Sequence, residues 1–198
     1  MKVKYFDLKN KRVFVTGGGS GIGASIVEHF CEQECEVYFV DINIKESKKL
    51  ISNLKKKKIK IPYFIECNLL KIKKLQGIIK KIIKSKGPID ILINNAANDD
   101  RHTTDQVDEK YWNNRMDVNL KHFFFTIKSV LNGMIKNKSG SIVNLSSVSW
   151  MMGEGDKVAY ETAKSAVIGL TRSFAREFGK YNIRCNSVTP GSIATERQ

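Results

Sequence analysis

Short apolar runs alternate with longer amphipathic stretches along the whole chain. Val, Ile, Phe and Tyr gather in runs that predict β-strands, at residues 12–16, 36–41, 61–67, 89–93, 141–145 and 183–188. Stretches of helical length lie between them, at 22–33, 45–56, 70–84, 108–136 (either continuous or broken near Arg115) and 159–179. Strands that alternate with helices are typical of βαβ units and a mostly parallel sheet. The pattern predicts a doubly wound α/β fold with helices on both faces of the sheet.

The length of the chain bounds its organisation. With 198 residues and 41% hydrophobic content, it suits one domain, residues 1–198, around a single core. The longest apolar runs, such as 37–40, are far shorter than the ~20 residues that cross a bilayer. The N-terminus passes from polar residues directly into the first predicted strand, without the apolar segment of a secretory signal. We therefore expect a cytoplasmic protein with no membrane span.

Four cysteines, Cys31, Cys35, Cys67 and Cys185, lack both the spacing of a zinc site and the density of a disulfide framework. Cys31 and Cys35 could share a metal on one helix, but no nearby His completes a ligand set. We expect reduced structural thiols and no metal site.

Positive charge is concentrated in one part of the chain. The formal net charge is +14, and segment 45–86 holds fifteen Lys against Glu46 and Glu66, a local balance of +13. A basic face can attract nucleic acid or an acidic membrane. This segment has no Arg, however, and only Tyr63 and Phe64 as aromatic residues for stacking. Lysines on solvated helix faces explain the pattern more simply, so we expect no specific nucleic-acid partner and no membrane partner.

A glycine-rich turn, TGGGSGIG at residues 16–23, joins the first predicted strand to the first predicted helix. Gly17, Gly21 and Gly23 let the backbone approach a pyrophosphate, and the N–H groups at the start of the helix attract its negative charge. Such a turn is weak evidence alone, because any tight strand-to-helix connection can use glycine. Its place between the first strand and the first helix predicts a dinucleotide site.

The second predicted strand ends at Asp41, about twenty residues after the glycine-rich turn. A carboxylate there accepts hydrogen bonds from the adenosine ribose hydroxyls and repels a 2′-phosphate. Ser20 leaves the turn without a basic residue to hold that phosphate, which favours NAD over NADP, while Lys45 is near enough to soften the preference. The alternative is that Asp41 only caps a loop.

Ser147, Tyr160 and Lys164 form the most specific chemical pattern of the chain. Residues i and i+4 share one face of a helix, so the ammonium of Lys164 can lie near the phenol of Tyr160 and lower its pKa from the usual value of ~10. The phenol then becomes usable as a general acid or base nearer neutral pH. With Ser147 thirteen residues before the tyrosine, the pattern predicts an enzyme that acts on an alcohol or a carbonyl.

A set of motifs resembles the short-chain dehydrogenase/reductase family over essentially the whole chain. They are TGGGSGIG, NNAA at 94–97, Asn119 in MDVNL, Ser147, YETAK at 160–164 and PGSIAT at 190–195. The resemblance implies a Rossmann-like fold and a catalytic tetrad in which Ser147 holds the reacting oxygen and Tyr160 exchanges its proton. In the same tetrad, Lys164 holds the nicotinamide ribose and lowers the pKa of the phenol, and Asn119 keeps a water in a relay from Lys164 to solvent.

The resemblance also implies a nicotinamide cofactor, and Asp41 together with Ser20 favours NAD over NADP. The residues expected to bind it are Gly17, Ser20, Gly21, Ile22, Gly23, Asp41, Ile42, Asn68, Leu69, Asn95, Ala96, Ala97, Tyr160, Lys164, Pro190, Gly191, Ile193 and Thr195. Asn68 stands where the family commonly has Asp, so we expect one adenine contact to be weaker.

A narrower resemblance relates NNAANDDRH, NLSSVSW, YETAKSAVIGLTRS and PGSIATERQ to the aldose 1-dehydrogenase branch. Members of that branch oxidise D-xylose, L-arabinose, D-galactose or related sugars at the anomeric carbon. Polar side chains beside an aromatic ring suit a pyranose, which presents hydroxyls and an apolar C–H face. The residues expected to contact the sugar are Asn98, Ser147, Ser149, Trp150 and Tyr160. The plainer alternatives are that Trp150 packs its loop and that Asn98 caps a turn.

The expected reaction is hydride transfer from C1 of an aldose to nicotinamide, which gives an aldonolactone. A reductase of 3-oxoacyl thioesters, or a dehydrogenase of another small alcohol, would share the same tetrad and glycine-rich turn. A catalytically silent protein that uses the basic segment to bind nucleic acid or an acidic partner is an alternative from another class. Members of the family usually continue beyond PGSIATERQ through a substrate-covering helix and a last strand. We therefore expect a chain truncated at its C-terminus, and a homo-oligomer for the full-length protein.

Overall fold

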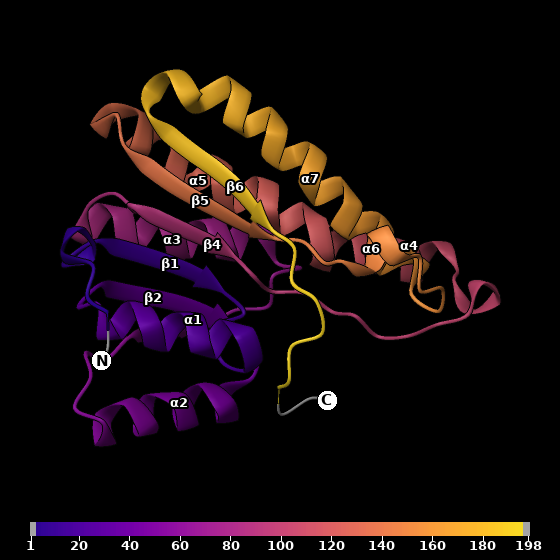
Figure 1. Ribbon diagram of the computed structural model, residues 1–198, viewed down its shortest axis with the longest axis horizontal. Helices are drawn as coiled ribbons and strands as arrows, with labels where there is room; N and C mark the ends of the chain where they lie inside the picture. Colours follow the sequence, from indigo (N-terminus) through magenta and orange to yellow (C-terminus); the bar gives the residue numbers. More distant parts are fainter. Residues whose placement is uncertain (1–2, 196–198) are drawn as a thin grey trace.

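Within residues 3–195, which the computed structural model describes, six strands form one parallel sheet (Figure 1). The strands are β1 (Arg12–Thr16), β2 (Glu36–Asp41), β3 (Tyr63–Glu66), β4 (Ile91–Asn94), β5 (Gly140–Leu145) and β6 (Ile183–Val188). They lie in the order β3-β2-β1-β4-β5-β6, and every neighbouring pair is parallel. The chain order reverses at the border of β1 and β4, which is where ligands bind in such sheets. The predicted doubly wound α/β fold, built as a single domain, is confirmed.

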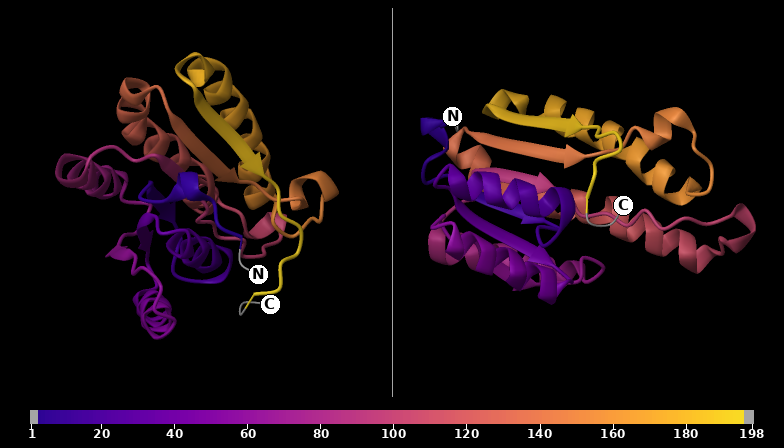
Figure 2. Two further views of the ribbon diagram at one scale, coloured as in Figure 1. Left: turned by 60° about the vertical axis from the view of Figure 1, so that its left-hand side comes forward. Right: turned by 60° about the horizontal axis from the view of Figure 1, so that its bottom comes forward.

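Helices cover both faces of the sheet (Figures 1 and 2). One face carries α1 (Gly21–Glu32) and α2 (Ile44–Lys56), and the other carries α3 (Ile72–Lys86), α5 (His122–Asn137) and α7 (Val158–Phe178). Shorter elements are α4 (Glu109–Met116), α6 (Ser149–Met152), the 3₁₀ turns η1 (Phe6–Leu8), η2 (Thr104–Gln106) and η4 (Gly179–Tyr181), and a π-helical turn, η3 (Asp117–Lys121). None of the helices within residues 3–195 has the length and apolar character needed to cross a bilayer.

The central strand β1 divides the core into two layers. Phe14 packs with Ile79 of α3 and Ile127 of α5, whereas Val13 and Val15 pack into the cluster formed by α1 and α2. Successive residues of a strand face opposite sides of the sheet, so a strand covered on both faces needs a continuous apolar run. This is why β1, β2 and β4 are buried along almost their whole length, whereas β6 alternates buried and exposed residues.

The structure shows that the helix predicted over residues 108–136 is continuous and that it contains a π-helical turn. The backbone does not break near Arg115, because α4 continues into α5 through η3 with helical dihedral angles throughout. A π-helical turn contains more residues than an α-helical turn, so it changes the direction of side chains without interrupting the helix. The short helix α6 was not predicted.

The four cysteines, all inside the described range, are buried free thiols. Burial raises the pKa of Cys31 to about 12 and that of Cys185 to about 11. These thiols are therefore protonated and unreactive around neutral pH.

Candidate active site

The glycine-rich turn has the backbone geometry that a phosphate site requires. Gly17 has a φ of 66°, and a Cβ at this position would lie only 2.8 Å from the Cα of Ala96. A Cβ at Gly23 would collide with the carbonyl oxygen of Gly17. Helix α1 then begins at Gly21, and within residues 3–195 the side chain of Ser20 makes no capping hydrogen bond to it. The first N–H groups of α1 thus remain available for an anion, which fits the predicted pyrophosphate.

The segment after β4 holds the glycine-rich turn in place. The hydroxyl oxygen of Thr16 accepts hydrogen bonds from the N–H groups of Asn95 (3.0 Å) and Ala96 (3.2 Å). The side-chain amide of Asn95 donates to the carbonyl oxygens of Thr16 (3.1 Å) and Gly17 (2.9 Å). The predicted residues Asn95 and Ala96 therefore do meet the turn. Thr16 was missed as a site residue, although its place directly before the glycines was a signal for it.

Asp41 also faces the glycine-rich turn. Its Oδ2 accepts from the N–H of Gly19 at 2.8 Å, and its Oδ1 accepts from the N–H of Asn43 at 2.8 Å. The carboxylate thus caps a loop, as the plainer alternative expected, and at the same time stands beside the predicted phosphate site. Each oxygen keeps a further lone pair with which it can accept a ribose hydroxyl.

Lys164 is almost completely buried, with 1% of its surface exposed. Its Nζ donates to the carbonyl oxygen of Leu145 at 2.6 Å and lies 5.6 Å from the ring centre of Tyr160. Burial lowers the pKa of Lys164 to about 7, with the carboxylate of Asp99 acting in the opposite direction. The amine can therefore gain or lose a proton near neutral pH.

The pKa of the Tyr160 phenol differs from the prediction. Burial raises its pKa above the usual value, the hydroxyl of Ser147 lowers it, and the charges of Asp99 and Glu154 raise it further. The net direction is opposite to the lowering expected from Lys164. The i, i+4 spacing places Lys164 near the ring, but the ammonium of Lys164 points to the carbonyl oxygen of Leu145. Burial removes water from around the phenol, and this desolvation raises its pKa.

The segment after β5 connects the sheet to α7. Ser147 Oγ lies 2.9 Å from Ser149 Oγ and accepts the N–H of Ser149 at 3.2 Å. Ser146 Oγ donates to the carbonyl oxygen of Lys164 at 2.7 Å and accepts from the indole Nε1–H of Trp150 at 3.2 Å. This hydrogen bond holds the indole of Trp150 in its loop, and the contact of Trp150 with a sugar stays a prediction. Ser146 was missed, because its role depends on a helix 18 residues away in the chain.

Asn119 lies in the π-helical turn η3 and is fully buried. Its Oδ1 accepts the N–H of Asn98 at 2.8 Å, and its Nδ2 donates to the carbonyl oxygen of Asn98 at 3.0 Å. The side chain of Asn98 accepts the N–H of Asp100 at 2.9 Å, which is the turn cap of the plainer alternative. Asn119 thus holds the loop that follows β4, and its water relay stays a prediction.

The remaining predicted cofactor residues lie in different environments. Asn68 is exposed and caps its own turn by accepting the N–H of Leu70 at 2.9 Å, while Leu69 is buried in the core. Ile42 is 68% exposed beside Asp41. Ala97 follows the segment that holds the turn, and Gly191 follows Pro190, whose carbonyl oxygen accepts the N–H of Val148. Residues 196–198, which end the PGSIATERQ phrase, lie outside the described residues.

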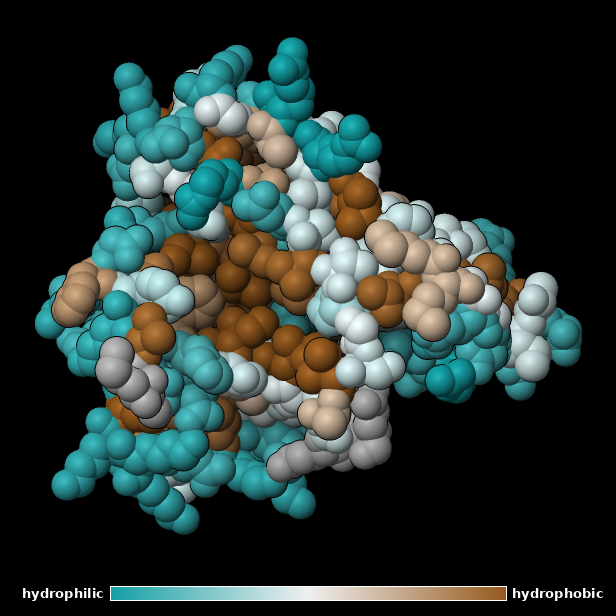
Figure 3. All heavy atoms as spheres, viewed as in Figure 1, coloured by the Kyte–Doolittle hydropathy of each residue, from teal (hydrophilic) through white to brown (hydrophobic). Residues whose placement is uncertain are grey.

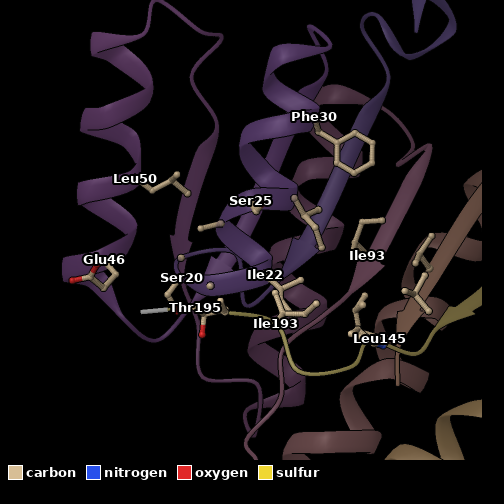
Figure 4. Close-up of a pocket in the computed structure, with 18 of the residues that line it drawn as sticks. Ser20, Ile22, Ser25, Phe30, Glu46, Leu50, Ile93, Leu145, Ile193 and Thr195 are labelled. Carbon is tan, nitrogen blue, oxygen red and sulfur yellow. The ribbon is translucent and has the colours of Figure 1, made fainter. Parts of the chain in front are cut away.

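The segment after β6 returns to the glycine-rich turn. Figure 4 shows Ile193 and Thr195 close to Ser20 and Ile22, and a Cβ built at Gly21 would lie 3.6 Å from Thr195 Cγ2. These residues form one end of an apolar hollow of about 1170 Å³ between α1, α2 and the sheet. The hollow is lined mainly by Ile26, Phe30, Leu50, Ile93, Val143, Leu145 and Val188, and it is visible as the brown centre of Figure 3. Among the described residues that line it, neither Ser147 nor Tyr160 occurs, so it is separate from the proposed chemistry.

A doubly wound parallel sheet with this turn after β1 defines the Rossmann-like class of α/β proteins. Residues 11–198 match the family model described as short chain dehydrogenase, and the chain belongs to that family.

Two curated relatives are sugar dehydrogenases by name. A D-xylose 1-dehydrogenase from Caulobacter vibrioides is 42% identical over 194 residues, which are 98% of this chain and 76% of the relative. A probable galactose dehydrogenase from Rhizobium meliloti is 41% identical over 192 residues, covering 97% of this chain and 75% of the relative. The solved structure of Thermoplasma acidophilum aldohexose dehydrogenase is similar with a TM-score of 0.85 and 33% identity, covering 97% of this chain and 70% of that one.

Proposed function

We propose that this chain is an NAD-dependent oxidoreductase that converts an aldose to the aldonolactone by removing a hydride from C1 and a proton from the hydroxyl on C1. The observation that carries the proposal is the meeting of Ser147, Tyr160 and Lys164 at the carboxyl edge of the sheet, where the glycine-rich turn also lies. The similarity to relatives named as dehydrogenases of xylose, galactose and aldohexose supports a sugar as the substrate.

The glycine-rich turn and Asp41 are the proposed cofactor contacts. The turn offers open helix N–H groups to a pyrophosphate, and Asp41 offers its two carboxylate oxygens to ribose hydroxyls. A 2′-phosphate would meet that carboxylate as a like charge, which favours NAD over NADP. Bound NAD would supply the hydride acceptor.

The proton is the part of the reaction that the protein handles. Tyr160 would accept the proton of the anomeric hydroxyl, and Ser147 would donate a hydrogen bond to the same oxygen. Burial keeps the phenol protonated around neutral pH, since the pKa of Tyr160 is raised. Oxidation would therefore accelerate as the pH rises, because a larger fraction of the phenol is then in the basic form.

Lys164 is a second group near Tyr160 that can take up or release a proton. Its pKa of about 7 allows it to exchange a proton near neutral pH, and it lies within 5.6 Å of the Tyr160 ring centre. The loop with Asn98 and the segment with Ser149 and Trp150 flank the site, and we propose that they contact the sugar hydroxyls and the apolar face of the ring.

The test is a panel of aldoses with NAD, followed at the absorbance of the reduced nicotinamide. D-xylose, L-arabinose and D-galactose are expected to be turned over by the wild-type chain. Tyr160→Phe should lower kcat by at least about 100-fold, because the proton-accepting group is lost, while NAD binding stays largely intact. Tyr5→Phe is the matched control, since Tyr5 is 57% exposed and far in sequence from the site.

The same variants distinguish the rival reaction. A 3-oxoacyl thioester assayed with the reduced cofactor would also depend on Tyr160, since both reactions move a proton at an oxygen. Turnover of the thioester with no turnover of any aldose would overturn the sugar assignment and keep the family chemistry. Near-normal sugar oxidation by Tyr160→Phe would instead overturn the catalytic assignment.

A further inference from the structure

Helix α7 carries Tyr160 in its first turn, and its start lacks the usual local cap. The first N–H groups of a helix have no partner inside the helix, and Ser, Thr, Asp or Asn at the N-cap normally accepts one of them. The N-cap of α7 is Lys157. Its ammonium can only donate hydrogen bonds, so it cannot accept a helix N–H, and within the described part of the chain its side chain makes no capping hydrogen bond. It pairs instead with Glu154 at 2.5 Å.

His102 supplies the missing acceptor from a distant part of the chain. The N–H of Ala159, the residue before Tyr160, donates to His102 Nε2 at 3.4 Å. His102 belongs to the loop between β4 and η2, 57 residues from Ala159 in sequence. Its side chain is buried, with 5% of the residue exposed, so the contact is protected from water.

The imidazole ring is held from its other side. Its Nδ1 lies 2.9 Å from the hydroxyl of Tyr111 and 3.2 Å from the carbonyl oxygen of Asp100. Because Nε2 accepts from Ala159, the neutral ring carries its proton on Nδ1, where these oxygens can accept it. Tyr111 also packs edge-on against the ring, with centroids 4.9 Å apart. The orientation of His102 is therefore determined by contacts on both nitrogens and by the packing of its ring against Tyr111.

The same loop also fixes the segment that leads into α7. The N–H of His102 donates to the carbonyl oxygen of Asp156 at 2.6 Å, and the neighbouring Arg101 forms an ion pair with the Asp156 side chain. Arg115 of α4 pairs with Asp100 at 3.2 Å and lies over the Tyr111 ring. The ribbon views show α4, α6 and the beginning of α7 together at one end of the molecule (Figures 1 and 2).

From this geometry we infer that His102 is a positioning residue for Tyr160. It acts as a remote N-cap that sets the first turn of α7, and with it the direction of the phenol toward Ser147. This role deepens the proposed function, on which it rests, because it gives the loop after β4 control over the proton-transfer group. It requires a neutral imidazole with Nε2 as the acceptor.

Two substitutions separate the cap from simple packing. In His102→Gln the amide oxygen can reach the position of Nε2, whereas in His102→Asn the shorter amide reaches only the position of Nδ1. We expect His102→Asn to lower kcat for sugar oxidation by roughly tenfold or more, since small displacements of a reacting group are costly. His102→Gln should remain within about threefold of wild type. The Kd for NAD should stay unchanged in both, because the hydrogen bonds of His102 join it to Asp100, Tyr111, Asp156 and Ala159, which are not among the proposed cofactor contacts.

Amide hydrogen exchange gives a readout that does not depend on turnover. The N–H of Ala159 is expected to exchange faster in His102→Asn and at the wild-type rate in His102→Gln. If the wild-type chain oxidises no sugar, the proposed function fails while the exchange experiment still tests the cap. Equal impairment of both variants, unfolding of both, or unchanged exchange and kcat in His102→Asn would each overturn the inference, because the ring would then serve only as packing.

Discussion

Lys164 makes a strong and unusual demand on the stability of the fold. Its amine is buried against the Leu145 carbonyl, 2.6 Å away, and lies 5.3 Å from the ring centre of Phe123. Burial disfavours the charged form of this amine, so a protonated Lys164 lowers the stability of the folded state. Substitution Lys164→Met removes the charge and keeps a flexible, unbranched side chain of similar length.

The expected effect is a change of stability with pH. The pKa of Lys164 is about 7 in the folded chain and 10.5 for a free lysine. Between these values the unfolded chain holds one more proton than the folded chain, so the free energy of unfolding rises with pH by about 1.4 kcal/mol per pH unit. Below about pH 7 both states hold the proton, and the folded state bears the full cost of the buried ammonium. Across the whole window the gain is on the order of 5 kcal/mol.

Urea unfolding at several pH values between 6 and 10, followed by tryptophan fluorescence, measures this gain. The quantity to compare is the difference in unfolding free energy between wild type and Lys164→Met, because the buried thiols titrate equally in both chains. The unfolding free energy of wild type should rise relative to that of Lys164→Met as the pH increases through this range. Lys128→Met, at an exposed position of α5, is the control. The difference in unfolding free energy between wild type and this variant should stay constant as the pH rises. Parallel pH curves for wild type and Lys164→Met would refute the reasoning, since they would mean that Lys164 stays charged inside the fold.

Further predictions concern the glycine-rich turn, Asp41 and the segment after β5. Asp41→Ala should raise the Kd for NAD and reduce the preference over NADP, because the like charge opposite a 2′-phosphate is gone; titration with both cofactors measures this. Gly23→Ala should abolish NAD binding or the fold, because the added methyl meets the Gly17 carbonyl, and calorimetry together with circular dichroism checks both. Trp150→Phe removes the donor to Ser146, so we expect a loss of about 1 kcal/mol in chemical unfolding with the sugar KM within about twofold.

The sequence by itself determined the strands and the turns. The positions of β1, β2 and β4 follow from continuous apolar runs, because a strand covered on both faces has no place for alternating polar residues, and that of β6 follows from its alternation of buried and exposed residues. The glycine-rich turn follows from local sterics, since Gly17 takes a positive φ and Gly23 has no room for a side chain beside the Gly17 carbonyl. Both kinds of information lie within a few neighbouring residues, and a sequence pattern can therefore carry them.

The tertiary structure alone decided how the site is held and charged. The cap that His102 gives to Ala159 and the bond from Ser146 to Lys164 join segments far apart in sequence, so no local pattern contains them. The pKa of Tyr160 was predicted from its neighbour on one helix and came out in the opposite direction. Desolvation depends on every element packed around the phenol, and that sum exists only once the sheet, α6 and α7 have come together.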